Sequence, residues 1–329
     1  MNIARISLDE VSRLGTGLKR PECVACTQSG EIWVSHALPG GGGGVARLEA
    51  DGSLHPVVAD DGAPEDFMPN GWCMEPGGSF LMSNLGNSGG VWRLHRDGRC
   101  EPVLRELHGQ PMAPVNFVHR DEAGRVWVSV STWRFPRERA FHRDVADGTV
   151  ILLDDNGARI VADGLGYTNE VKVDPSGAYL YAHETLARAL SRFALIERDG
   201  MLALGPREVV VSYMDGIIPD GFEFDAAGGI WCTSVMSNQL VRVTPDGRQT
   251  VVLEDYDPDD IARGMNHWRS GCFGRKDMDI GSARTLASLA SITFGGPDLR
   301  TGYLGSLFGD CLFTFESPVA GAVPPHWYF

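Results

Sequence analysis

Short apolar strands recur along this chain, and each one is introduced by a glycine. An apolar run of this length, bounded by turn residues, is typical of a β-strand. A second strand follows and ends at an Asp-Gly or Asn-Gly pair, which suits a tight hairpin turn. The five leading stretches are Gly30-Glu-Ile-Trp-Val-Ser, Gly78-Ser-Phe-Leu-Met-Ser, Gly124-Arg-Val-Trp-Val-Ser, Gly177-Ala-Tyr-Leu-Tyr and Gly228-Gly-Ile-Trp-Cys-Thr.

The unit repeats every 46 to 53 residues. One such unit cannot bury its own apolar face, so neighbouring units must pack together. The pattern therefore predicts an all-β fold, a six-bladed β-propeller with four-stranded blades. The sixth unit covers residues 294–315, and residues 4–14 remain to supply its outer strand. We expect a single propeller domain over residues 1–329 that is closed by the N-terminal segment, because an open edge strand invites aggregation.

Two stretches are longer than a blade requires, at residues of about 131–147 and 255–289. Long loops on a rigid scaffold commonly form the walls or lid of a binding site. We expect both insertions to be loops of this kind. For residues 255–289, an ordered surface insertion or a contact between subunits is an alternative interpretation.

A carboxylate or amide residue lies eight positions before each of the five glycines. Equivalent positions of a closed propeller form a circle around one axis, so these side chains should converge. Their oxygen atoms are the ligands that a hard divalent cation prefers. Asn-Gly and Asp-Gly are also common turn dipeptides, which would explain two of the five without a site. The five residues are Glu22, Asn70, Asn116, Asn169 and Asp220.

Composition narrows the class of partner. Apolar residues make up 43% of the chain and charged residues 22%, as in a globular protein, and no apolar run is long enough to cross a bilayer. The net charge of −14, without a basic run, argues against nucleic acid as a partner. The N-terminus lacks an apolar signal core, so we expect a cytoplasmic protein that has no membrane partner.

The seven cysteines are scattered, and Cys23 and Cys26 form the only C-x-x-C pair. Residues three apart on a strand face opposite sides of a sheet, so this pair does not suit a shared metal. We expect buried, reduced thiols.

Four motifs in the right order resemble the SMP-30/gluconolactonase (regucalcin-like) family of six-bladed propellers. They are Pro21-Glu22, Gly166-Tyr-Thr-Asn169 with Val173-Asp-Pro-Ser-Gly177, Ile218-Pro-Asp-Gly221 and Phe294-Gly-Gly-Pro-Asp-Leu-Arg-Thr301. The resemblance implies a lactone hydrolase that holds one divalent cation on Glu22, Asn169 and Asp220. It also implies that Asn116 touches the metal or the substrate, and we expect Asn70 to bind the substrate together with it.

Three positions depart from the pattern that this resemblance implies. Pro114 and Phe117 stand where many sugar-lactone members carry arginine and aspartate, and Glu170 replaces a usual glycine. With Trp133 from the first insertion, Phe117 predicts an apolar wall and a substrate less hydroxylated than gluconolactone. Alternatively, the arginines of the same insertion recognise a sugar or carboxylate; they are Arg134, Arg137 and Arg139.

Two carboxylates would neutralise a doubly charged ion, and amide oxygens would add ligands without adding charge. We expect Ca²⁺ first, with Mg²⁺, Mn²⁺, Zn²⁺ or Fe²⁺ as further candidates. Such an ion polarises a lactone carbonyl, and Asp220 is the expected ligand and base beside the attacking water. The alternatives are hydrolysis of another ester, such as a phosphotriester, and a calcium-binding propeller without catalysis.

Overall fold

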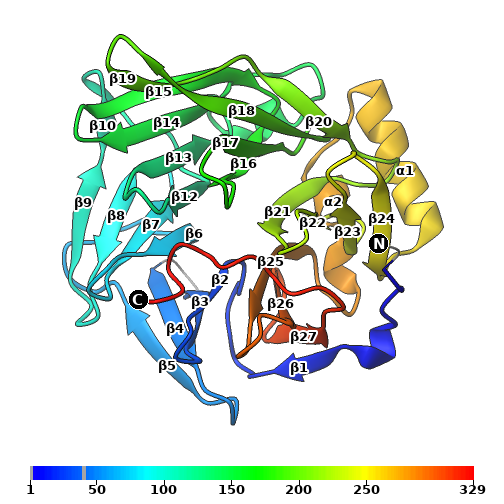
Figure 1. Cartoon of the computed structure of the whole chain (residues 1–329). Coiled ribbons are helices and arrows are strands. Elements are labelled where there is room, and N and C mark those ends of the chain that lie inside the picture. The colour runs from blue at the N-terminus through cyan, green and yellow to red at the C-terminus, as the bar shows by residue number, and fades with distance from the viewer. Residues whose placement is uncertain (1–2, 39–41) are drawn as a thin grey trace.

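The computed structural model describes residues 3–38 and 42–329. Six small antiparallel sheets surround one axis, and the chain passes around the ring from blade to blade (Figure 1). The predicted six-bladed propeller is confirmed. In each blade the first strand lies innermost, and β12 contacts the innermost strands of both neighbouring blades, β6 and β16.

The first three blades each have four strands in chain order. Blade one contains β2 (Val24–Cys26), β3 (Ile32–Ala37), β4 (Gly43–Leu48) and β5 (Leu54–Val58). Blade two contains β6 (Pro69–Met74), β7 (Phe80–Asn84), β8 (Val91–Leu94) and β9 (Cys100–Leu104). Blade three contains β12 (Phe117–Arg120), β13 (Val126–Val130), β14 (Gly148–Asp154) and β15 (Gly157–Leu165). A small hairpin of β10 (Glu106–Leu107) and β11 (Gln110–Pro111) connects blades two and three.

Blade four departs from the four-strand pattern because its third strand is long enough to pair with two partners. It contains β16 (Thr168–Val173), β17 (Tyr179–Glu184), β18 (Ala189–Arg198), β19 (Met201–Leu204) and β20 (Glu208–Ser212). The N-terminal half of β18 pairs with β20 and its C-terminal half with β19. The result is a sheet of five strands.

Blades five and six complete the ring. Blade five contains β21 (Pro219–Phe224), β22 (Ile230–Ser234), β23 (Gln239–Val243) and β24 (Gln249–Glu254), and blade six contains β25 (Leu289–Gly295), β26 (Thr301–Ser306) and β27 (Leu312–Glu316). The outer strand of blade six is β1 (Ser12–Leu14), which follows the short 3-10 helix η1 (Leu8–Glu10) and pairs antiparallel with β27.

The five leading glycines occupy the turn between the first and second strands of their blades. All five have a positive φ, from 70° at Gly177 to 90° at Gly78, which residues with a Cβ rarely adopt. The repeat found in the sequence is therefore a repeated turn geometry.

Apolar side chains fill the spaces between neighbouring blades. Trp33 and Trp72 pack on Phe80 between blades one and two, with ring centroids 5.0 and 5.5 Å apart. In blades three and five a fully buried tryptophan donates its indole N–H to a buried aspartate, at 2.9 Å in both pairs, Trp127–Asp121 and Trp231–Asp225. The blade cores thus lie away from the axis, which leaves the inner strand ends available for a site.

The second insertion is helical, which the sequence reading did not anticipate. It contains α1 (Pro258–Ser270), α2 (Arg275–Met278) and the 3-10 helix η3 (Asp279–Ala283). A start signal is present, because the Asp257 side chain caps α1 and Pro258 is its first residue. The first insertion carries one 3-10 turn, η2 (Arg137–Ala140). No helix in the described ranges is both long and apolar enough to span a membrane.

Candidate active site in the central channel

Residues from five different blades line one cavity of about 410 Å³ at an end of the central channel. They are the five residues that precede the repeated glycines, Glu22, Asn70, Asn116, Asn169 and Asp220. All five side chains are buried. The structure therefore brings together the complete set that the repeat selected.

Irregular strand pairing places several of these side chains on the axis. Between Pro69 and Trp72 the innermost strand of blade two skips a register position, so Asn70 and Gly71 lie in a bulge. The same shift occurs around Asn169 in blade four and around Asp220 in blade five. A bulge redirects a side chain relative to a regular strand, and bulges are frequent at functional sites.

Blade six has the equivalent irregularity between Leu289 and Ser291, so Ala290 is its counterpart of Asp220. A methyl group offers no ligand atom. At the position equivalent to Asp220, the sixth blade therefore contributes no polar side chain.

Asn70-Gly71 and Asp220-Gly221, the two dipeptides at the ring positions, are part of strands and not of turns. A Cβ at Gly71 would lie 2.1 Å from the ring of Phe117, and a Cβ at Gly221 would lie 2.5 Å from the backbone oxygen of Ala290. Both glycines permit close packing of neighbouring inner strands. The turn interpretation of these dipeptides is therefore wrong.

Asp220 is held by its neighbours in blade four. The side-chain amide of Asn169 donates hydrogen bonds to Oδ1 of Asp220 and, at 3.1 Å, to Thr185. The backbone oxygen of Asp220 lies 2.7 Å from Nδ1 of His183. Burial raises the pKa of Asp220 well above its usual value, and the nearby carboxylates of Glu22 and Glu170 raise it further.

Arg20 enters the site beside Glu22, and the sequence reading missed it. Its guanidinium lies 2.7 Å from Oε2 of Glu22 and donates a hydrogen bond of 2.6 Å to Oδ1 of Asn70. The amide of Asn70 in turn donates to the backbone oxygen of Asn116 at 2.9 Å. The basic group beside Glu22 and Asn70 therefore comes from blade one.

The oxygen atoms of this ring suit a cation. Oε2 of Glu22 and Oδ1 of Asn116 are both buried and accept no hydrogen bond, although the Arg20 charge lies beside the former. Unsatisfied buried acceptors are rare in proteins and call for an explanation such as an ion. Across residues 3–38 and 42–329, no three His, Cys, Asp or Glu side chains cluster for metal binding. Any cation here would thus depend on two carboxylates together with amide oxygens.

Both insertions contribute to the wall of the cavity. Arg137, Glu138 and Phe141 come from the first insertion, and Arg275, Met278 and Asp279 from the second. Tyr167, two residues before Asn169, packs edge to face against Phe141 with centroids 5.3 Å apart. The first insertion and the segment that precedes Asn169 therefore meet in the wall of the cavity.

Phe117 and Trp133 do not line this cavity, which corrects their predicted role as its apolar wall. Phe117 follows Asn116 directly, and successive side chains of a strand point in opposite directions. Its ring packs on Gly71 within the core between blades one and two. Trp133 donates its indole N–H to Thr149 at 3.2 Å and is partly exposed. From the same insertion Arg137 lines the cavity, whereas Arg134 pairs with Asp147.

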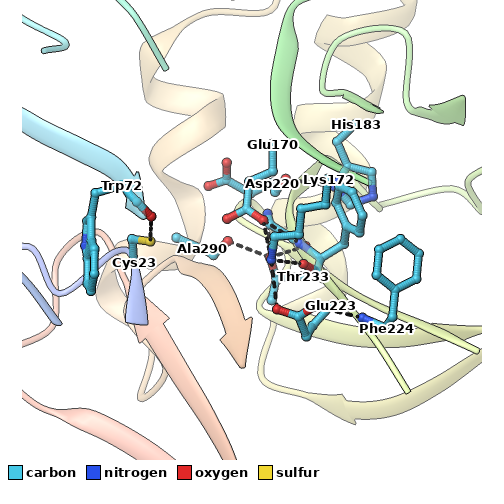
Figure 2. A network of polar contacts seen from close by, with 12 residues as sticks. Cys23, Trp72, Glu170, Lys172, His183, Asp220, Glu223, Phe224, Thr233 and Ala290 are labelled. Carbon is cyan, nitrogen blue, oxygen red and sulfur yellow. Dashed lines mark hydrogen bonds and ion pairs between the residues drawn. The ribbon is translucent and has the colours of Figure 1, made fainter. Parts of the chain in front are cut away.

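Below the ring, the ion pair between Lys172 and Glu223 connects blades four and five (Figure 2). Nζ of Lys172 lies 3.2 Å from Glu170 and 3.0 Å from Glu223. Burial raises the pKa of Glu170 to about 7 even though Lys172 opposes this shift. The pKa of Lys172 is raised because Glu170 and Glu223 outweigh the effect of burial. Glu170 is thus part of a charged network.

A second cavity of about 250 Å³ is lined in part by residues 322–326 near the C-terminus. Phe117, His119 and Lys172 line it. His119 is buried and its Nε2 has no partner, and burial lowers its pKa to about 3.

Curated relatives of this chain include two lactonases. Pentonolactonase XacC of Haloferax volcanii is 27% identical over 59% of this chain, a match that covers only 54% of that protein. The 6-deoxy-6-sulfogluconolactonase of Pseudomonas putida is 26% identical over 78% of this chain and 76% of its own length.

Solved structures share the fold at low sequence identity. A gluconolactonase from Xanthomonas campestris superimposes with a TM-score of 0.66 and 18% identity over 95% of this chain and 89% of the other. Regucalcin from Agrobacterium tumefaciens, described as a calcium-binding protein, superimposes with a TM-score of 0.65 and 17% identity. The match covers 99% of this chain and 98% of the other. The family model for the SMP-30/Gluconolactonase/LRE-like region matches residues 62–255, which is more than half of the chain. With its ring of inner-strand carboxylates and amides, the chain belongs to the SMP-30/gluconolactonase/LRE-like family.

Proposed function

We propose that this protein is a divalent-metal-dependent lactonase. The observation that carries the proposal is the convergence of Glu22, Asn116, Asn169 and Asp220 on one cavity of a propeller in this family. Two curated relatives are named as lactonases, and both names specify sugar-acid lactones.

Glu22, Asn169 and Asp220 would hold the cation. Asn116 lines the same cavity, and its unpartnered Oδ1 would be a further ligand. The donor set is all oxygen with two carboxylates, which favours Ca²⁺ and also accommodates Mg²⁺ or Mn²⁺. Zn²⁺ and Fe²⁺ bind carboxylates as well and belong in any comparison. A bound cation would supply Lewis acidity toward the lactone carbonyl oxygen.

Asp220 would transfer a proton of the attacking water. Hydrolysis adds a water oxygen to the carbonyl carbon and breaks the bond from that carbon to the ring oxygen. One proton of the water passes to Asp220 and then to the departing ring oxygen, so the product is a hydroxy acid. The hydrogen bond from Asn169 fixes the orientation of the Asp220 carboxylate for both transfers.

The polar residues that line the cavity support a polar substrate. Arg20, Arg137 and Tyr167 present hydrogen-bonding groups there, whereas Trp133 and Phe117 lie elsewhere. A lactone with hydroxyl groups would satisfy such donors, while an alkyl lactone would leave them unpaired. The wall therefore favours the alternative, arginine-based recognition over the apolar substrate expected from the sequence.

A panel of γ- and δ-lactones, followed by proton release with each of the five metals, tests the function. We expect turnover that disappears with a chelator and returns with Ca²⁺. Asp220→Asn should abolish turnover, whereas Asp97→Asn on an exposed turn should not change it. Calcium binding without hydrolysis of any lactone or carboxylic ester would instead identify a binding propeller. Turnover of phosphotriesters alone would identify a different hydrolase.

A further inference from the structure

Two arginines from different insertions are held on one aromatic pair at the mouth of the cavity. The guanidinium of Arg137 lies 5.5 Å from the ring centroid of Tyr167, and that of Arg275 lies 4.9 Å from the ring of Phe141. The two rings contact each other edge to face. Guanidinium groups stack on aromatic faces, and such stacking restricts their motion. Both arginines line the cavity.

Arg137 has little compensation for its charge. Its Nε donates a hydrogen bond of 2.8 Å to the hydroxyl of Tyr167. Among the residues that the structure describes, no carboxylate forms an ion pair with it, whereas Arg20 has Glu22 at 2.7 Å. Within residues 3–38 and 42–329, Arg275 forms two longer ion pairs, 3.6 Å to Glu138 and 3.5 Å to Asp279. Both guanidinium groups therefore retain donors for a ligand.

The charges of the complete wall favour an anion. Three guanidinium groups and a doubly charged cation would face four carboxylates, which leaves one positive charge in excess. The charged residues of the wall are Arg20, Arg137 and Arg275 with Glu22, Glu138, Asp220 and Asp279.

We propose that the substrate is a lactone that carries a free acidic group, a carboxylate or a sulfonate, in addition to the ring ester, and that Arg137 and Arg275 bind this group. This inference rests on the proposed lactonase function and names its substrate class. Guanidinium groups bind carboxylates and sulfonates through paired, charge-assisted hydrogen bonds, which makes arginine suited to this recognition. Arg137 and Arg275 are specificity-determining residues that do not take part in the opening of the ring.

A matched pair of substrates tests the proposal. D-Glucaro-1,4-lactone has a carboxylate where D-glucono-1,4-lactone has a hydroxymethyl group, and the rings are otherwise the same. A third lactone with a sulfonate at this carbon separates the two kinds of acid. We expect kcat/KM to be about tenfold or more higher for at least one acidic lactone than for the neutral one, mainly through KM.

Arg137→Gln and Arg275→Gln should each reduce this acid-to-neutral ratio by about tenfold, because each removes charge-assisted hydrogen bonds. Arg137→Lys should restore only part of the ratio, since an ammonium group cannot bind in the forked geometry. Arg139→Gln is the matched control: it removes the same charge from the same 3-10 turn, but its exposed side chain does not line the cavity.

Binding of the open-chain products separates this proposal from the lactonase function. Glucarate should bind more tightly than gluconate in the presence of Ca²⁺, and Arg137→Gln should remove the difference. Faster hydrolysis of the neutral lactone, or an unchanged ratio in Arg137→Gln and Arg275→Gln, would overturn the acidic substrate while the lactonase stands. If no lactone is opened but glucarate still binds through Arg137, the lactonase fails and the anion site stands. Absence of both would refute both.

Discussion

Nζ of Lys172 lies 3.0 Å from Oε2 of Glu223, and this pair ties the strand that carries Asn169 to the strand that carries Asp220 (Figure 2). Oε2 of Glu170 accepts the backbone N–H of Phe222 at 3.1 Å, and Lys172 donates to the backbone oxygen of the same residue. Asp220 lies in the bulge just before Phe222, where regular pairing is lost. Side chains from the neighbouring blade thus replace part of the missing backbone pairing.

Lys172→Met should destabilise the protein by roughly 3–5 kcal/mol, because it leaves the buried carboxylate of Glu170 and the partly buried carboxylate of Glu223 without their cation. Chemical denaturation measures the loss. The double variant Lys172→Met, Glu170→Gln should recover part of it, since the glutamine removes one of the uncompensated charges. Arg263→Met, which breaks an exposed pair with Asp260, should change stability by less than about 1 kcal/mol.

An effect of Lys172→Met no larger than that of Arg263→Met would show that water already compensates the charges in the channel. The buried pair would then have no structural role. A double variant less stable than Lys172→Met alone would contradict the same account, because it would mean that Glu170 stabilises the fold without Lys172.

Calcium should stabilise the wild-type protein against heat, because a ligand that binds only the folded state shifts the unfolding equilibrium. At a concentration of one hundred times the Kd, the gain is about 2.7 kcal/mol. Glu22→Gln, Asn169→Ala and Asp220→Ala should each lose most of this gain and all turnover while they remain folded, since the blade cores lie away from the axis. Scanning calorimetry with and without Ca²⁺ provides the measurement.

The pattern across these variants identifies the ligands. If a variant retains the full calcium-dependent gain in stability and full turnover, the substituted residue is not a ligand of the metal. A variant that has lost the gain but also unfolds at a much lower temperature without calcium has a structural defect, and calorimetry without metal distinguishes the two cases.

Acid should destabilise the protein through His119. Its pKa is lowered to about 3 in the folded state by burial, while the unfolded chain has an ordinary value near 6.5. The unfolded state therefore binds one more proton between these values, and stability falls as the pH falls through this window. The slope is about 1.4 kcal/mol per pH unit for this single group.

His119→Phe removes the proton-binding group and keeps a ring of similar size. The difference in unfolding free energy between this variant and the wild type should change by the slope of one proton between pH 6.5 and about 4, and it should be constant above pH 7. Parallel pH profiles would mean that His119 binds its proton equally well in both states, which would contradict its burial without a partner.

The repeat made the propeller and the five ring residues predictable from the sequence, because a symmetric ring brings equivalent positions to one axis. Periodicity could not reveal what breaks the symmetry. Ala290 has no polar side chain to mark its blade, and Arg20 enters from beside a ring residue and not from a repeated position.

Phe117 and Trp133 show a second limit. Phe117 is adjacent to Asn116 in sequence, but alternation along the strand turns it into the core. Trp133 belongs to an insertion that lines the cavity, yet only the structure shows that Arg137, Glu138 and Phe141 are the residues of this segment that do so. Within a long insertion, contacts set the direction of each side chain, and no repeat indicates them.

Deletion of residues 1–16 should expose the edge of blade six, because β1 is the outer strand that pairs with β27. Unpaired strand edges promote association. We expect a lower melting temperature and concentration-dependent association in light scattering, relative to the wild type. Arg13→Ala removes the side-chain contacts with Asp310, Cys311 and Phe313 but leaves β1 in place, so it should not associate like the deletion variant.

Thiol reactivity gives this deletion a local readout. Cys272 is exposed and the other six cysteines are buried, and the Sγ of Cys311 lies 3.2 Å from Nε of Arg13 beside β1. The wild type should therefore show one fast-reacting thiol with a disulfide reagent, and the deletion variant should show two. An additional Cys311→Ser substitution should return the count to one. A deletion variant with one fast thiol and an unchanged melting temperature would show that β1 does not protect this edge.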